Sequence, residues 1–108
     1  MDENVLDLRL RVGSHLTASL LGVGDVRLLE GYCDDERSRK ALLITIFITE
    51  AHGNDAVNLW WRTGQVKLAN MSPLLAFRAN YANPAILRAA MEFIDQGTIK
   101  RRFPKGPE

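Results

Sequence analysis

The sequence predicts an α+β fold, in which an antiparallel meander sheet of five to six strands carries two C-terminal helices packed on one face. Two observations indicate the strands: Val5–Val12 alternates apolar and polar residues, and Ala41–Glu50 is the longest apolar run in the chain. The helices are indicated by the pairs Ser72-Pro73 and Asn83-Pro84, each of which begins a stretch with helical spacing. With 108 residues, 46% of them apolar, the chain is long enough to bury a core as one domain.

The first predicted strand, Val5–Val12, places its leucines on one face. Residues 14–21 allow two interpretations. The favoured one is a hairpin with a three-residue loop that begins at Gly13, because only that register keeps the buried face apolar. The alternative is a short helix with Ser14 as its N-cap and Gly22 just past its end.

Four further strands complete the predicted sheet. Val26–Cys33 follows a turn that begins at Gly22, and Ala41–Glu50 forms the centre of the sheet because one of its faces is wholly aliphatic. A two-residue turn at Thr63-Gly64 makes a hairpin of residues 59–68, in a register where the facing side chains are compatible.

The stronger of the two predicted helices is Pro84–Gln96, which we expect to end at Gly97. Its apolar stripe covers more than half of the helix circumference, which favours burial on two sides, against the sheet and against a second molecule. Residues 1–97 are therefore predicted to form a single α+β domain. Residues 98–108, with two prolines and no periodicity, are predicted to form a basic, flexible tail.

Charge and cysteine content limit the protein class. The net charge is +1, with a near-neutral body and a basic C-terminal end, which argues against a protein that mainly coats nucleic acid. A single cysteine, Cys33, excludes an intrachain disulfide and fits a reducing compartment. The acidic N-terminal segment lacks the features of a secretory signal, and the ten apolar residues of Ala41–Glu50 are too few to span a bilayer. We expect a cytoplasmic protein without membrane contact.

No catalytic or metal-binding set of residues is predicted. Glu50 and His52 would share one face of a strand and could form an acid/base pair, but a strand end that enters solvent is the favoured interpretation. A metal site needs three or four ligands, and the other histidine, His15, lies in a distant turn. Cys33 could act as a nucleophile if His15 or His52 folded beside it, but its acidic neighbours would raise its thiol pKa, so a structural role is favoured. We therefore expect a protein that is not an enzyme and uses no cofactor or metal.

The predicted partner-binding surface is the outer face of the sheet. On a one-sided sheet, Trp60 and Trp61 cannot both point into the same core, so Trp60 is expected on the outer face. Arg62 and Lys67 would lie beside it, and tryptophan with arginine is typical of protein–protein hot spots.

The half-polar face of the central strand enlarges this surface, because it would expose Phe47 and Leu43. The main hypothesis is therefore a small non-enzymatic protein-interaction module of the inhibitor, immunity or chaperone-like kind. It would bind and occlude a protein partner, and could itself be a homodimer.

The alternative hypothesis is a nucleic-acid-binding accessory protein. Phosphate contacts would come from the basic tail and from two arginines of the predicted helices: Lys100, Arg101, Arg102, Lys105, Arg78 and Arg88. Few further cations are available in the body, which makes this the weaker of the two hypotheses.

Overall fold

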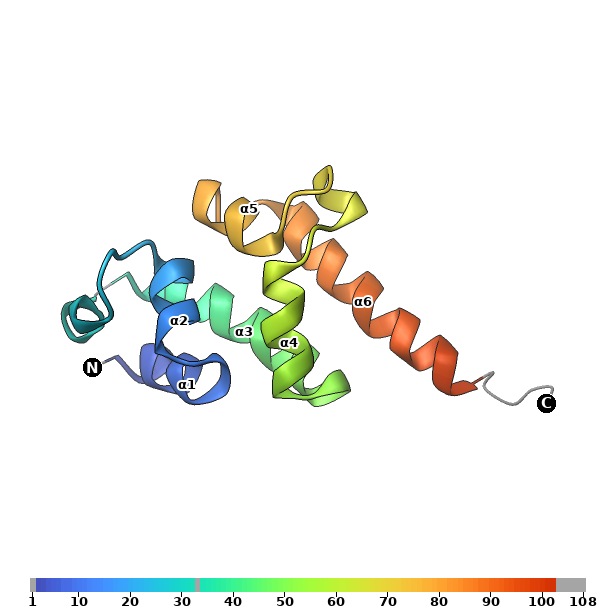
Figure 1. Cartoon of the computed structure of the whole chain (residues 1–108), viewed down its shortest axis with the longest axis horizontal. Helices are drawn as coiled ribbons and strands as arrows, with labels where there is room; N and C mark the ends of the chain where they lie inside the picture. The colour runs from blue at the N-terminus through green and yellow to red at the C-terminus, as the bar shows by residue number, and fades with distance from the viewer. Residues whose placement is uncertain (1, 33, 103–108) are drawn as a thin grey trace.

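The computed structural model describes residues 2–32 and 34–102, and this part of the chain is helical without any β-strand. Short connections join the helices (Figure 1). The α-helices are α1 (Glu3–Val12), α2 (Ser14–Leu21), α3 (Asp35–His52), α4 (Asn54–Arg62), α5 (Pro73–Ala79) and α6 (Pro84–Arg102), and the 3₁₀ helices are η1 (Val26–Gly31) and η2 (Val66–Leu68). The predicted α+β fold with an antiparallel sheet is therefore wrong.

The longest of the inner helices, α3, lies at the centre of the arrangement. It packs against α1, α2, α4 and α6, while α5 bridges α2, α4 and α6. α6 runs beside α3 and then continues away from the other helices toward the C-terminus (Figure 1). One main core therefore lies around α3, and it takes side chains from every α-helix.

The apolar run Ala41–Glu50, predicted as the central strand, lies entirely inside α3. Its buried residues are Ala41, Leu42, Ile44, Thr45 and Ile48, which recur at the spacings of three and four residues typical of a helix. Helices α1, α2, α4 and α6 cover α3 on several sides, and the exposed residues of this run, Leu43, Phe47 and Glu50, share the remaining side. Burial therefore overrides the strand preference of its β-branched residues.

The alternating segment Val5–Val12 is likewise helical and belongs to α1. Its core residues are Val5, Leu8 and Val12, at spacings of three and four, while Leu6 and Leu10 point to solvent. The sequence satisfies both periods because Val5 adds an apolar residue out of the alternating phase. The segment adopts the helical period, because a helix places these core residues on the side that packs against α3.

Two glycines form corners of the same geometry between consecutive helices. Gly13 joins α1 to α2 with φ 90° and ψ 162°, and Gly53 joins α3 to α4 with φ 94° and ψ 168°. At each corner the glycine N–H donates to the carbonyl four residues earlier, at 2.9 Å for Gly13 and 2.7 Å for Gly53. This region of φ and ψ is essentially restricted to glycine, so both corners depend on the missing side chain.

The hairpin predicted at Gly13 is wrong, and the helical alternative for residues 14–21 is close to the structure. α2 covers Ser14–Leu21, but its N-cap is Gly13 and not Ser14. Gly22 ends the helix in the left-handed conformation, and Val23 N–H donates to Ala18 O at 3.0 Å. This is the bond pattern of a Schellman motif.

The predicted strand Val26–Cys33 is a 3₁₀ helix, Val26–Gly31, as far as the structure describes it, and Cys33 lies outside the described residues. Asp25 caps this helix, because its carboxylate accepts a hydrogen bond from Arg27 N–H at 2.9 Å. A second, smaller core lies beneath it and contains Val5, Ala18, Leu21 and Leu29.

The hairpin predicted for residues 59–68 is replaced by the end of α4, a bend and η2. Val57, Trp60 and Trp61 are all buried. On a strand, neighbours point to opposite faces, but on a helix they are about 100° apart and can enter one core together. The Trp61 indole N–H donates to Thr45 Oγ1 of α3 at 3.1 Å, which satisfies its polar group inside the core.

The two predicted helix starts are confirmed. Ser72 Oγ accepts from Leu75 N–H at 3.3 Å, with Pro73 in the first turn of α5. At the next start, Asn83 Oδ1 accepts from Ala85 N–H at 3.0 Å. The predicted stop at Gly97 is wrong, because α6 continues to Arg102. The remainder of the predicted tail, residues 103–108, lies outside the described part of the chain.

Arg37 connects α3 to two other helices. Its Nε donates to the Leu20 carbonyl at the end of α2 at 3.2 Å. Its guanidinium lies 5.7 Å from the ring centre of Phe77 and 5.8 Å from that of Tyr81. These contacts combine a hydrogen bond with two cation–π interactions.

Arg37→Ala is therefore expected to lower the free energy of unfolding by roughly 2 kcal/mol. Arg37→Lys should recover less than half of this loss, because an ammonium group cannot stack as a planar guanidinium does. Urea denaturation followed by circular dichroism measures both values. Arg39→Ala, an exposed position on the same helix, is the control and should change stability by less than about 0.5 kcal/mol. An Arg37→Lys variant as stable as the parent would contradict this account.

Candidate functional site

An apolar surface feature lies between the neighbouring helices α3 and α6. Four large apolar side chains are about half exposed there: Leu43 (45%), Phe47 (47%), Leu87 (43%) and Met91 (52%). We call these four residues the α3–α6 face. Exposed apolar side chains that are clustered, unlike single ones, are typical of interaction sites.

The face arises from the helical spacing of its residues. Leu43 and Phe47 are four residues apart on α3, and Leu87 and Met91 are four apart on α6, so each pair forms a row along its helix. The side chains that hold the two helices together, Ile44 and Ile86 among them, are buried beneath these rows. The core thus fixes the position of the exposed residues.

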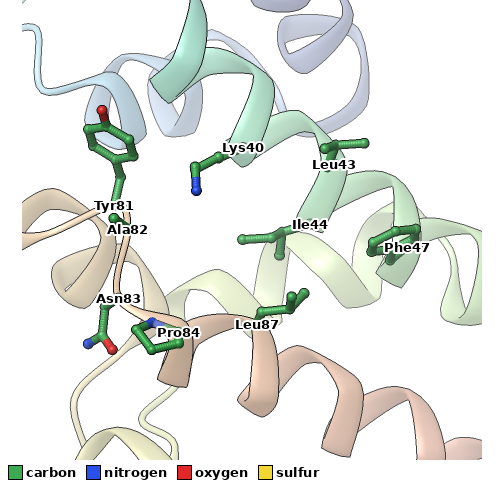
Figure 2. Close-up of a pocket in the computed structure, with 9 residues that line it drawn as sticks. All are labelled: Lys40, Leu43, Ile44, Phe47, Tyr81, Ala82, Asn83, Pro84 and Leu87. Atoms are coloured by element: carbon green, nitrogen blue, oxygen red, sulfur yellow. The ribbon is translucent and has the colours of Figure 1, made fainter.

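A groove of about 340 Å³ opens on the α3–α6 face. Figure 2 shows Ile44 and Leu87 side by side in its middle, Phe47 at one end and the loop from Tyr81 to Pro84 at the other. Lys40 extends into its polar edge. The volume lies within the range of pockets that accept an apolar side chain or a small ligand.

A second hollow of about 720 Å³ continues along α6 on the other side of Leu87. It is lined by Met91 and by charged residues of α6, with Lys67 at its rim. The Lys67 ammonium lies 3.7 Å from a carboxylate oxygen of Glu92. The apolar rows are therefore bordered by charged side chains, as in the core-and-rim arrangement of protein interfaces.

Tyr81 stands where the groove meets the loop before α6. Its hydroxyl donates to Glu36 Oε1 at 3.3 Å, and its ring contacts that of Phe77. The negative charge of Glu36 raises the pKa of Tyr81 above its ordinary value, because it disfavours a phenolate. Tyr81 is thus a neutral hydrogen-bond donor at neutral pH and no candidate for a base.

The structure separates the four residues predicted to bind a partner. Phe47 belongs to the α3–α6 face, and Lys67 lies at the rim of the second hollow. Arg62 is exposed at the end of α4, outside both hollows. Trp60 is only 2% exposed, so the prediction that its indole lies on an outer face is wrong. The prediction assumed that Trp60 and Trp61 cannot both point into one core. That holds on a strand, but on a helix neighbouring side chains can both point inward.

Leu87 and Met91 were not among the predicted site residues. In the sequence they belong to the broad apolar stripe of the last helix, for which burial on two sides is predicted. Within that stripe Ile86 and Ala90 are buried, whereas Leu87 and Met91 remain half exposed. The sequence signal for these exposed apolar residues was therefore the width of the stripe, which is greater than one buried face requires.

The six basic residues of the alternative hypothesis are only partly described. Arg78 and Arg88 are exposed, on α5 and α6. Lys100, Arg101 and Arg102 fall within the last turns of α6, but their side chains, and all of Lys105, lie outside what the structure describes. On α6 the acidic residues Glu92 and Asp95 stand between Arg88 and the basic end. Phosphate binding by this set stays a prediction.

The residues weighed for chemistry do not come together. Glu50 and His52 both lie on α3, where a separation of two residues places them on nearly opposite sides of the helix. The His52 ring contacts Phe93 edge-on at 4.8 Å, with its Nε2 3.2 Å from the Phe93 carbonyl oxygen. Among the described residues, no group of three or more His, Cys, Asp or Glu could hold a metal ion.

Comparison with protein-family models, with curated proteins and with solved structures found no match for this chain. None of the helices in the described part is both long enough and apolar enough to cross a membrane.

Proposed function

We propose that this chain is a small, non-enzymatic protein-interaction module and that its α3–α6 face binds a helix of another polypeptide chain. The observation that carries the proposal is the pair of apolar rows, Leu43 with Phe47 and Leu87 with Met91, each about half exposed on a packed support. A groove between two helices matches the known mode in which an amphipathic helix lays its apolar face into a hydrophobic groove.

In this mode the partner inserts one large apolar side chain into the 340 Å³ groove between Ile44 and Leu87. Burial of the half-exposed side chains supplies free energy at about 25 cal/mol per Å². The charged border, which includes Lys40 and Lys67, sets orientation more than affinity. The module would act by occluding the surface it binds, as an inhibitor, an immunity protein or a chaperone does. We also propose a cytoplasmic location, which the single cysteine supports.

Photo-cross-linking in cells tests this proposal. A benzophenone amino acid replaces Phe47 in one variant and Leu10 in a control, since Leu10 is 76% exposed on α1, away from the face. We expect the probe at position 47 to label a helical segment of another chain that the probe at position 10 does not label. A probe at position 87 should label the same segment, and adding Phe47→Glu to that variant should abolish the adduct.

Two results would contradict the proposal. One is a set of adducts that is the same from positions 47 and 10, which would indicate random collisions. The other is a probe at position 47 that gives no adduct with any polypeptide after prolonged irradiation.

A further inference from the structure

The two ends of the α3–α6 face carry opposite charges. On α3, Lys40 lies one turn before Leu43, and Glu50 lies one turn after Phe47. At 100° per residue these four side chains fall within about 80° of the helix circumference, so the charges flank the apolar row. Glu50 is exposed, and Lys40 is partly exposed at the edge of the groove.

The four residues of this row on α3 are spaced symmetrically about its centre. Lys40 and Glu50 are equally far from the midpoint between Leu43 and Phe47, and these two apolar residues are equally far from it as well. If a second α3 lies antiparallel across the first, Lys40 of each copy faces Glu50 of the other. Leu43 of each copy then faces Phe47 of the other, so one rotation satisfies the charged and the apolar contacts together.

The row on α6 has the same polarity. α6 runs in the same direction as α3, since Ile44 shares the groove with Pro84 and His52 contacts Phe93 farther along both helices. Along α6, Arg88 precedes Met91 and Asp95 follows it, and both charged residues are exposed. A two-fold axis at the centre of the α3 row passes α6 near Leu87, so Leu87 lies close to the axis and the charge complementarity comes from the α3 rows alone.

We propose that the chain forms a two-fold symmetric homodimer, in which α3 and α6 of each copy pack antiparallel against those of the other through the α3–α6 face. This inference rests on the proposed function and names the partner as a second copy of the chain. Charge complementarity favours this occupant, because the pattern of cation, two apolar residues and anion complements itself only when it is reversed. A parallel arrangement would set Lys40 against Lys40 and Glu50 against Glu50.

Sedimentation equilibrium of the full chain at low salt, over a wide range of concentration, tests the dimer. We expect Phe47→Glu to weaken self-association by about 100-fold or more, because it places a charge at the centre of an apolar interface. Leu10→Glu is the matched control, with the same change of charge at an exposed leucine of α1, and should leave self-association unchanged. Circular dichroism confirms that each variant keeps its helical content.

Charge exchange tests the antiparallel direction. Lys40→Glu and Glu50→Lys should each weaken the dimer by about tenfold, since each turns two attractive pairs into two repulsive ones. The double variant Lys40→Glu/Glu50→Lys should regain the parent affinity. Single variants that dimerise as well as the parent would overturn the antiparallel arrangement.

A parent chain that stays monomeric at the highest concentration would overturn the homodimer. If the probe at position 47 then still labels a different polypeptide in cells, the inference fails and the proposed function stands. If it labels nothing, both fail.

Discussion

Replacing Trp60 with alanine is expected to lower the free energy of unfolding by about 3–5 kcal/mol. The indole is 2% exposed and meets the Trp61 ring edge-on at 5.0 Å, so truncation removes many contacts and leaves a cavity in the main core. Since small domains are stable by only about 5–15 kcal/mol, the variant should be partly unfolded at moderate temperature. Urea denaturation followed by circular dichroism measures the change.

Leu59→Ala is the matched control, because Leu59 lies on the same helix and is 66% exposed. It should change stability by less than about 0.5 kcal/mol. A Trp60→Ala variant as stable as the control would mean that the indole lies at the surface after all.

Phenylalanine substitutions refine the same comparison. Trp60 Nε1 is buried without a hydrogen-bond partner among the described residues, whereas Trp61 Nε1 donates to Thr45. Trp61→Phe should therefore cost about 1–3 kcal/mol more than Trp60→Phe, since it leaves Thr45 Oγ1 without its donor.

Replacing Gly53 with alanine is expected to lower the free energy of unfolding by about 1–3 kcal/mol. No atom outside the neighbouring residues lies within 4 Å of a Cβ built at Gly53, so the cost comes from the backbone and not from a clash. The φ of 94° with ψ near 168° is a conformation that alanine rarely adopts. Thermal and urea unfolding measure the loss.

Gly13→Ala should give nearly the same loss, because the second corner has the same dihedral angles and hydrogen bonds. Gly31→Ala is the control: its Cβ also meets nothing within 4 Å, and its φ lies outside the left-handed range. This variant should be neutral or slightly stabilising, since alanine restricts the unfolded chain. A Gly53→Ala variant that behaves like Gly31→Ala would refute the strained corner.

Phe47 is a predicted partner-binding residue; its predicted exposure is confirmed, but the predicted strand that carries it is wrong. It was placed on the outer face of a strand, and it is exposed on the outer side of a helix. An apolar residue that has no place in the core is exposed in either structure. Lys40 and Glu50 flank this row only on a helix, because on a strand they would point to the face opposite Leu43 and Phe47.

The sequence by itself determined the features that depend on a few neighbouring residues. The helix starts at Ser72-Pro73 and Asn83-Pro84 follow from a capping side chain and a proline with a fixed φ. These effects act within one turn of the chain, and no distant contact is needed to decide them.

Only the tertiary structure decided whether Ala41–Glu50 and Val5–Val12 are strands or helices. Both segments satisfy a period of two and a helical period, so the local free energies are close. The choice is made by packing: α1, α2, α4 and α6 cover α3 on several sides, and burial of the side chains on those sides outweighs the preferences of single residues. The same packing buries Trp60 and leaves Phe47 outside, because the positions of the surrounding helices determine which side of α3 and of α4 they cover.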